Sequence, residues 1–241
     1  MQGLGIRDQE IHFVTFFYLH GFASGSKSTK AAFLGERLGS YGVSFRCPDF
    51  NQPDFRTLTM TRMLEQLTDA VRAADSLPAV LIGSSLGGAL AVLAAQSLAA
   101  QVDRLVLFAP AVMFAKPGHH LLPPERVEEW RRRGSLPFFH YGYHEERLLD
   151  FSFYEDTIRY DAFDAVVKQP TLIFQGLHDR SVPFQTVEKF AEARPNVTLS
   201  LLDDDHQLVA SLPRMWNDLA PFLGLTECGR LSVWSSRCWG S

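Results

Sequence analysis

The stretch AVLIGSSLGGALAVLAA, residues 79–95, joins a short apolar run, a turn rich in Gly and Ser, and an Ala-rich segment. The apolar run predicts a buried strand and the Ala-rich segment predicts a helix. The turn between them has the pattern Gly-x-Ser-x-Gly, with Ser85 at its centre and Gly83 and Gly87 on either side. In a strand–turn–helix of this kind the central Ser sits on a sharp, strained turn, and the residues two before and two after it crowd one another. The pattern therefore predicts an accessible hydroxyl at Ser85, in front of a helix N-terminus that favours negative charge.

The same alternation of strand and helix continues on both sides of this stretch. Apolar runs rich in β-branched and aromatic residues, with little polar alternation, are typical of strands buried on both faces. The predicted strands are residues 13–19, 43–46, 79–82, 104–108, 171–175 and 197–202, and the predicted helices are residues 31–38, 58–74, 86–100, 185–193 and 213–223. This order predicts right-handed βαβ units in an α/β domain with an open, mostly parallel sheet flanked by helices.

One long segment, residues 111–166, interrupts the alternation, because it is rich in proline and contains no run typical of a strand. A structureless loop of this length is uncommon in a compact domain. We therefore expect a small helical cap or lid, inserted into a core made of residues 1–110 and 167–225. Its basic run, residues 131–133, is interpreted as a solvated helix face, and the polar end of the chain, residues 226–241, as a disordered tail.

The overall composition is that of an ordinary globular protein, with 46% hydrophobic and 21% charged residues. A net charge of −4 argues against nucleic acid or an anionic membrane as the main partner. No apolar run approaches the roughly 20 residues that span a bilayer, and the N-terminus has no signal pattern. Three cysteines make no disulfide framework. We expect a cytoplasmic monomer or homodimer that acts on a small molecule, without a metal or another cofactor.

The residues that could activate Ser85 lie downstream. A serine hydroxyl is a weak nucleophile at neutral pH and needs a histidine oriented by a carboxylate. Asp179 follows the predicted strand 171–175, and His206 follows the predicted strand 197–202. The carboxyl ends of parallel strands meet at one edge of a sheet, where ligands bind. The sequence thus predicts a catalytic triad of Ser85, Asp179 and His206.

Other histidines and carboxylates near these positions allow a competing hypothesis. A metal site could use His178, residues 203–205 and the predicted triad partners. Such a site gives no reason for the Gly-x-Ser-x-Gly turn, so we interpret His178 and the pair His119 and His120 as non-catalytic.

The N-terminal stretch FYLHGFASGSKSTKAAF, residues 17–33, is similar to a phosphate-binding loop. However, Ser26 stands where that pattern requires its second Gly. A triad of this kind catalyses acyl transfer, which builds negative charge on a carbonyl oxygen and needs N–H donors to stabilise it. We assign this oxyanion hole to the amide of Leu86, which follows Ser85, and to that of Phe22, in the loop after the first predicted strand. Lys27 is then expected to be a surface residue near the start of a helix.

The candidate substrate-binding residues are mostly aromatic, and ordinary packing of a small cap is their alternative interpretation. They are His20, Phe138, Phe139, Tyr141, Phe153 and Tyr154. For His20 we favour a role in shaping its loop.

Taken together, these motifs resemble the α/β-hydrolase superfamily, and in particular small bacterial serine esterases of the YqiA-like kind. The likeness covers residues 13–223 and lies in Leu19-His20-Gly21-Phe22, residues 83–88, Gly176-x-x-Asp179-x-x-Val182-Pro183 and Asp205-His206. It implies hydrolysis of short- to medium-chain carboxylic esters through an acyl-enzyme, on an α/β-hydrolase sheet of about six to seven strands that lacks one or two N-terminal edge strands. The same machinery serves thioesterases, acyltransferases and C–C hydrolases, and a non-catalytic receptor with this fold remains an alternative.

Overall fold

The core of the protein is a six-stranded, wholly parallel sheet with the strand order β2-β1-β3-β4-β7-β8. The computed structural model describes residues 14–74, 78–114, 116 and 122–225, so the predicted tail lies outside the described residues. The strands of this sheet are β1 (Thr15–Leu19), β2 (Ser44–Arg46), β3 (Ala79–Ser84), β4 (Val102–Phe108), β7 (Thr171–Gly176) and β8 (Val197–Leu202).

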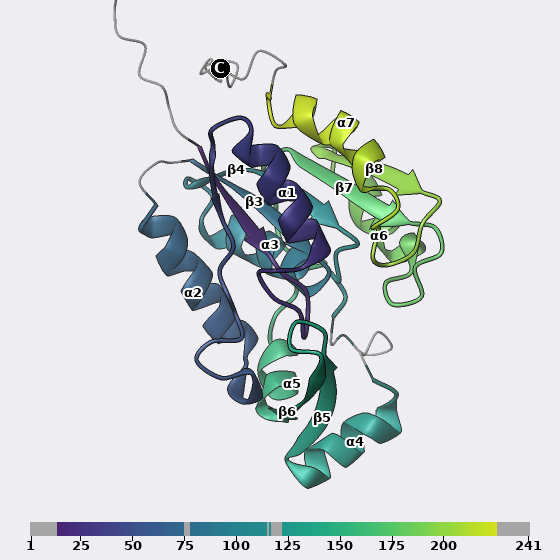
Figure 1. Cartoon of the computed structure of the whole chain (residues 1–241). Coiled ribbons are helices and arrows are strands. Elements are labelled where there is room, and N and C mark those ends of the chain that lie inside the picture. The colour runs from purple at the N-terminus through teal and green to yellow at the C-terminus, as the bar shows by residue number, and fades with distance from the viewer. Residues whose placement is uncertain (1–13, 75–77, 115, 117–121, 226–241) are drawn as a thin grey trace, which may run out of the picture.

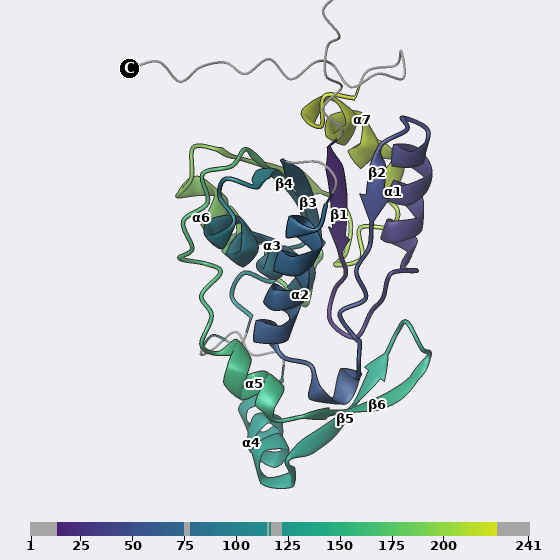
Figure 2. The same cartoon turned by 90° about the vertical axis from the view of Figure 1, so that its left-hand side faces the viewer.

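Helices cover both faces of the sheet (Figure 2). One face carries α1 (Thr29–Gly39) and α7 (Leu212–Phe222), and the other carries α2 (Met60–Arg72), α3 (Leu86–Ser97) and α6 (Phe184–Glu192). All six predicted strands and all five predicted helices are present, with ends within three residues of the expected positions.

Strand β1 explains why the strands of this chain read as continuous apolar runs. Phe16 and Tyr18 pack into the core on the α1 and α7 side, whereas Phe17 and Leu19 pack into the core on the α3 side. All four side chains are buried, because helices exclude water from both faces. The expectation of a doubly covered α/β sheet is therefore confirmed.

The interrupting segment lies beyond the carboxyl ends of the central strands (Figure 1). It contains α4 (Pro124–Arg133), β5 (Ser135–His140), β6 (Glu145–Asp150) and α5 (Ser152–Thr157). The segment has two helices, as a helical cap requires, but the expectation that it contains no strand is wrong, because β5 and β6 pair as an antiparallel hairpin. Pro137 is tolerated in β5 because this two-stranded sheet consists only of edge strands.

The polar surface of the interrupting segment accounts for its weak strand signal. Most of β6 is exposed, which is why its sequence, EERLLD, is charged. The basic run 131–133 is also exposed, as expected for a solvated helix face. Trp130 joins α4 to the hairpin, since its indole N–H donates to the carbonyl of Leu149 in β6 at 2.8 Å.

Lys27, in the glycine-rich N-terminal stretch, lies just before the start of α1. Ser28 caps the helix, and its hydroxyl accepts a hydrogen bond from the Ala31 amide at 3.3 Å. Lys27 precedes the cap and is exposed, which confirms its expected place at the surface.

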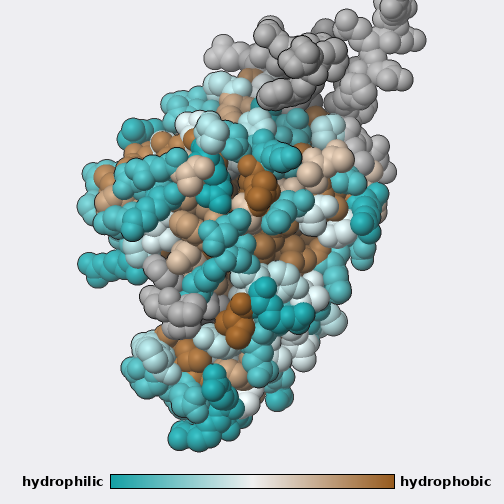
Figure 3. All heavy atoms as spheres, turned by 180° about the vertical axis from the view of Figure 1, so that it is seen from behind, coloured by the Kyte–Doolittle hydropathy of each residue, from teal (hydrophilic) through white to brown (hydrophobic). Residues whose placement is uncertain are grey.

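The outer surface is mainly polar. Seen from behind, hydrophilic side chains cover most of it, and apolar side chains show between them in several places (Figure 3). None of the helices in the described ranges is both long and apolar enough to cross a membrane.

Candidate active site

Ser85 occupies the turn between β3 and α3 with φ +53° and ψ −115°, a conformation that non-glycine residues rarely adopt. Hydrogen bonds hold the strained residue on both sides: its amide donates to the Phe108 carbonyl at 2.9 Å, and its carbonyl accepts from the Ala111 amide at 3.0 Å. A Cβ atom on Gly83 would overlap the backbone of Gly87, so the turn requires a residue without a side chain there.

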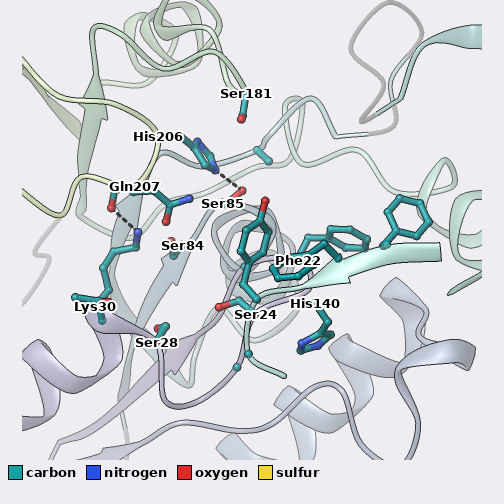
Figure 4. A pocket seen from close by; sticks show the side chains of 18 of the residues that line it. Phe22, Ser24, Ser28, Lys30, Ser84, Ser85, His140, Ser181, His206 and Gln207 are labelled. Atoms are coloured by element: carbon teal, nitrogen blue, oxygen red, sulfur yellow. Dashed lines mark hydrogen bonds between the residues drawn. The ribbon is translucent and has the colours of Figure 1, made fainter. Parts of the chain in front are cut away.

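The three predicted catalytic residues meet at the carboxyl end of the sheet. Figure 4 shows two of them, Ser85 and His206, with the hydrogen bond between them. His206 Nδ1 lies 2.7 Å from Asp179 Oδ2, and His206 Nε2 lies 3.1 Å from Ser85 Oγ. Because an ionised carboxylate only accepts, Nδ1 carries the proton and Nε2 accepts from the serine hydroxyl. This tautomer is the one in which His206 can remove the Ser85 proton.

Asp179 is held ionised by its hydrogen bonds. Its side chain is fully buried, and its oxygens accept from the amides of Ser181 and Val182, both at 2.8 Å, and from Gln175 Nε2 at 3.0 Å. Burial alone would raise the pKa of Asp179, but the hydrogen bonds from His206 and Val182 outweigh it and hold the pKa below its ordinary value. The group therefore remains an acceptor for the imidazole.

The loop after β8 that carries His206 is held by distant groups. Gly176 lets it approach the end of β7, because a Cβ atom there would come within 2.5 Å of the carbonyl oxygens of Asp204 and Asp205. Lys30 donates from Nζ to the Gln207 carbonyl at 2.6 Å, across 177 positions of the chain. Burial lowers the pKa of Lys30 to about 8, against the opposing attraction of nearby carboxylates.

Sequence reasoning missed Gln175 and Lys30, which orient the triad without belonging to it. Neither follows from a local pattern, because each acts on a residue brought close only by the fold. The sequence offered one signal, the polar residue Gln175 at the end of a mainly apolar run.

The two amides predicted to bind an oxyanion lie beside Ser85. Leu86 is the first residue of α3, where an N–H group has no partner within the helix. Phe22 belongs to the His-Gly loop, residues 20–25, which packs closely on the serine turn. A Cβ atom on Gly21 would lie 3.3 Å from the Ser84 carbonyl oxygen and 3.4 Å from Ser85 Cβ. Within the described part of the chain, neither amide donates a hydrogen bond to another protein group.

A cleft of about 1570 Å³ opens above these residues and has two unlike sides. Lys30, Ser28 and Ser84 lie on one side of Ser85, and Phe22 lies on the other (Figure 4). On the apolar side the rings of Phe114 and Phe138 lie against that of Phe22, and all three line the cleft.

The candidate substrate-binding residues divide into two groups. Phe138, Phe139 and Tyr141 line the cleft. Phe153 and Tyr154 do not line it: Phe153 is buried with its ring 5.5 Å from that of Phe22, and Tyr154 stacks on Phe151, the residue before α5.

His20 is likewise a structural residue and does not line the cleft. Its Nδ1 lies 3.0 Å from the Gly21 carbonyl, and its Nε2 accepts from the Phe50 amide at 3.1 Å. Both ring nitrogens are therefore used to shape the His-Gly loop, and a substrate contact through His20 is not supported.

The residues of the competing metal hypothesis do not converge. His178 is exposed and contacts Asp203 at 2.6 Å, on the outer side of the loop. Among the residues that the structure describes, no group of three or more His, Cys, Asp or Glu side chains is placed to hold a metal ion.

Known proteins similar to this chain are described as esterases or hydrolases. The chain is 25% identical over 214 residues to "Putative esterase/lipase 2" of Mycoplasma pneumoniae, covering 78% of this chain and 80% of that protein. Its fold matches the crystal structure of "Putative hydrolase from Agrobacterium vitis S4" with a TM-score of 0.75 and 28% identity, over 86% of this chain and 87% of the other. It also matches Est1E of Butyrivibrio proteoclasticus, solved with ferulic acid bound, with a TM-score of 0.75 and 21% identity over 90% of each chain.

The first two of these proteins support hydrolase activity. The architecture is that of an α/β hydrolase. A family model described as "Uncharacterised protein family (UPF0227)" matches residues 15–222. The chain therefore belongs to the UPF0227 family.

Proposed function

We propose that this protein is a carboxylic ester hydrolase that works through a serine acyl-enzyme on short- to medium-chain esters. One observation carries the proposal: Ser85, on a strained turn, is hydrogen-bonded to His206 and through it to Asp179, beside two amides that donate to no other group among the described residues. No simpler structural role explains why a strained serine, a correctly tautomeric histidine and a buried carboxylate occur together.

The reaction follows from these positions. Ser85 Oγ attacks the ester carbonyl carbon while its proton passes to His206 Nε2. The resulting imidazolium is stabilised by Asp179, and the carbonyl oxygen, now negative, accepts from the amides of Phe22 and Leu86. His206 then protonates the leaving alcohol, and the same nitrogen activates the water that releases the acid.

The apolar side of the cleft is the proposed acyl site. Phe22, Phe114 and Phe138 would surround an acyl chain, and the interrupting segment 111–166 would act as a cap over it. Burial of each methylene group is worth about 0.8 kcal/mol, so affinity should rise with chain length until the cleft is filled. Esters whose acyl chain is too long for the cleft should be hydrolysed more slowly.

The test is a series of p-nitrophenyl esters, from acetate to palmitate, with the wild type and the Ser85→Ala variant. We expect hydrolysis by the wild type and a loss of more than about 10³-fold in the variant, with covalent labelling of the wild type alone by a fluorophosphonate. The Ser84→Ala variant is the matched control, because Ser84 precedes the nucleophile and the hydroxyl bonded to His206 is that of Ser85. Ester hydrolysis that survives in Ser85→Ala would overturn the proposal.

A further inference from the structure

The His-Gly loop is held from outside by two segments that are distant in the sequence. Its carbonyl groups at Ala23 and Ser24 both accept hydrogen bonds from outside the loop, whereas its amide at Phe22 donates none within the described residues. Ala23 also has a φ of +50°, a conformation that persists only where its surroundings impose it. The position of the free amide thus depends on groups beyond the loop itself.

Asn51 is the first of these groups. It is 3% exposed, and its Nδ2 donates to the Ser24 carbonyl at 2.8 Å and to Asp49 Oδ1 at 2.7 Å. Because both acceptors face Nδ2, the orientation of the amide is determined, and Oδ1 must be the acceptor on its other side. That oxygen lies 3.0 Å from His140 Nε2, so the histidine is the donor.

His140 brings in the β5–β6 hairpin. Its ring is completely buried, stacked on Tyr143 at 4.1 Å between centroids and edge-on to Phe55 at 4.8 Å. The next residue, Tyr141, donates its amide to the Ala23 carbonyl at 2.7 Å. The hairpin therefore reaches the loop directly at Ala23 and through Asn51 at Ser24.

The same hairpin also packs on the side chain of the loop. The ring of Phe138 in β5 meets the ring of Phe22 edge-on at 5.4 Å. The ring of Phe22 is thus packed against β5, and the carbonyls of the next two residues accept hydrogen bonds from Tyr141 and Asn51. Figure 4 places Phe22, Ser24 and His140 on one side of Ser85, where these contacts lie.

We propose that Asn51 and His140 are positioning residues of the hydrolytic site, which hold the His-Gly loop so that the Phe22 amide faces the reacting carbonyl oxygen. The inference rests on the proposed function and adds to it that the interrupting segment supports the oxyanion hole as well as covering the cleft. Neither side chain needs to touch the substrate. Their effect is on the transition state, because the oxyanion forms only there.

The expected effect is moderate and falls mainly on kcat. Removing an oxyanion donor costs about 10²- to 10³-fold, and a displacement of roughly 1 Å costs about 10²-fold. A loosened donor should cost less than a missing one, so we expect a fall in kcat of about 10- to 100-fold. KM should change little, because the ground-state ester makes the same contacts in the cleft.

The experiment uses Asn51→Leu and His140→Phe in the full chain. The second variant keeps a ring against Tyr143 and Phe55 and removes only the N–H donor to Asn51. Two quantities are measured for each: kcat and KM with p-nitrophenyl butanoate, and the inhibition constant of a trifluoromethyl ketone with a matched acyl chain. Ser85 adds to this ketone and leaves the oxygen negative, so its affinity reports on the oxyanion hole.

Asn196→Leu is the matched control, because Asn196, like Asn51, donates from Nδ2 to two acceptors, here the carbonyls of Val167 at 3.1 Å and Gln169 at 2.8 Å, but does not line the cleft. A parallel loss of kcat and ketone affinity in Asn51→Leu and His140→Phe, and not in the control, supports the proposal. If the folded His140→Phe variant keeps both values at the level of the control, the positioning role is wrong. A wild type without Ser85-dependent ester hydrolysis refutes the proposed function, and with it this inference.

Discussion

Replacing Gly21 by Val should slow ester hydrolysis by about 10- to 100-fold, whereas replacement by Ala should slow it only a few-fold. A Cβ atom at this position would lie 3.3 Å from the Ser84 carbonyl oxygen and 3.4 Å from Ser85 Cβ. Both contacts are tight without being forbidden, and relief requires a shift of a few tenths of an ångström. Gly21 is not among the glycines with positive φ, so the cost is steric and does not come from backbone strain.

The branched side chain of Val adds a further methyl group at this contact and must move the serine turn or the His-Gly loop. Either movement disturbs the 3.1 Å approach of Ser85 Oγ to His206 Nε2 or the position of the Phe22 amide. Since a misplacement of roughly 1 Å costs about 10²-fold, a shift of several tenths of an ångström accounts for the expected range.

The assay is steady-state hydrolysis of p-nitrophenyl butanoate by the wild type and both variants, with thermal melting as the check on folding. Gly39→Ala is the control, because a Cβ atom there meets nothing within 4 Å. A Gly21→Val variant that is folded and as fast as the wild type would show that the His-Gly loop does not set the geometry of the nucleophile. Equal losses for Ala and Val would show that the effect is not steric.

Three further predictions concern the charged groups. Asp179→Asn should lower kcat by about 10³- to 10⁴-fold with little change in KM, because an amide can donate to Nδ1 and favour the wrong tautomer of His206; steady-state kinetics test this. Burial lowers the pKa of His140 below its ordinary value of 6.5. Below pH 6.5 the unfolded chain therefore binds more protons at His140 than the folded chain does, and the fold loses stability as the pH falls. The melting temperature should fall less steeply with decreasing pH in His140→Phe than in the wild type. Lys30→Met should lower kcat by about ten-fold and reduce the melting temperature, because the Gln207 carbonyl loses its donor; kinetics and melting at neutral pH measure both.

The triad could be predicted from the sequence because each member follows its own strand. Ser85, Asp179 and His206 each come a few residues after a continuous apolar run, and parallel strands bring these positions to one edge. The strands themselves were predictable because burial on both faces removes polar alternation from them.

The supporting residues could not be predicted, because their partners are distant in the sequence. Asn51 lies among loop residues, and nothing local indicates that its oxygen meets His140, 89 positions later. The β5–β6 hairpin escaped prediction for a different reason. Pro137 and the charges of β6 are unfavourable for a central strand, but they are acceptable in a hairpin with one side in water.

The hydrogen bond between Lys30 and Gln207 bears on the order in which the site forms during synthesis of the chain. It joins α1 to the loop after β8, which lies at one edge of the sheet and is the last strand of the described part of the chain. During synthesis the serine turn emerges long before His206, and contacts of such high sequence separation form late in folding. On the proposed mechanism, a nascent chain therefore carries Ser85 without its base, and hydrolytic activity should appear only once β8 has docked.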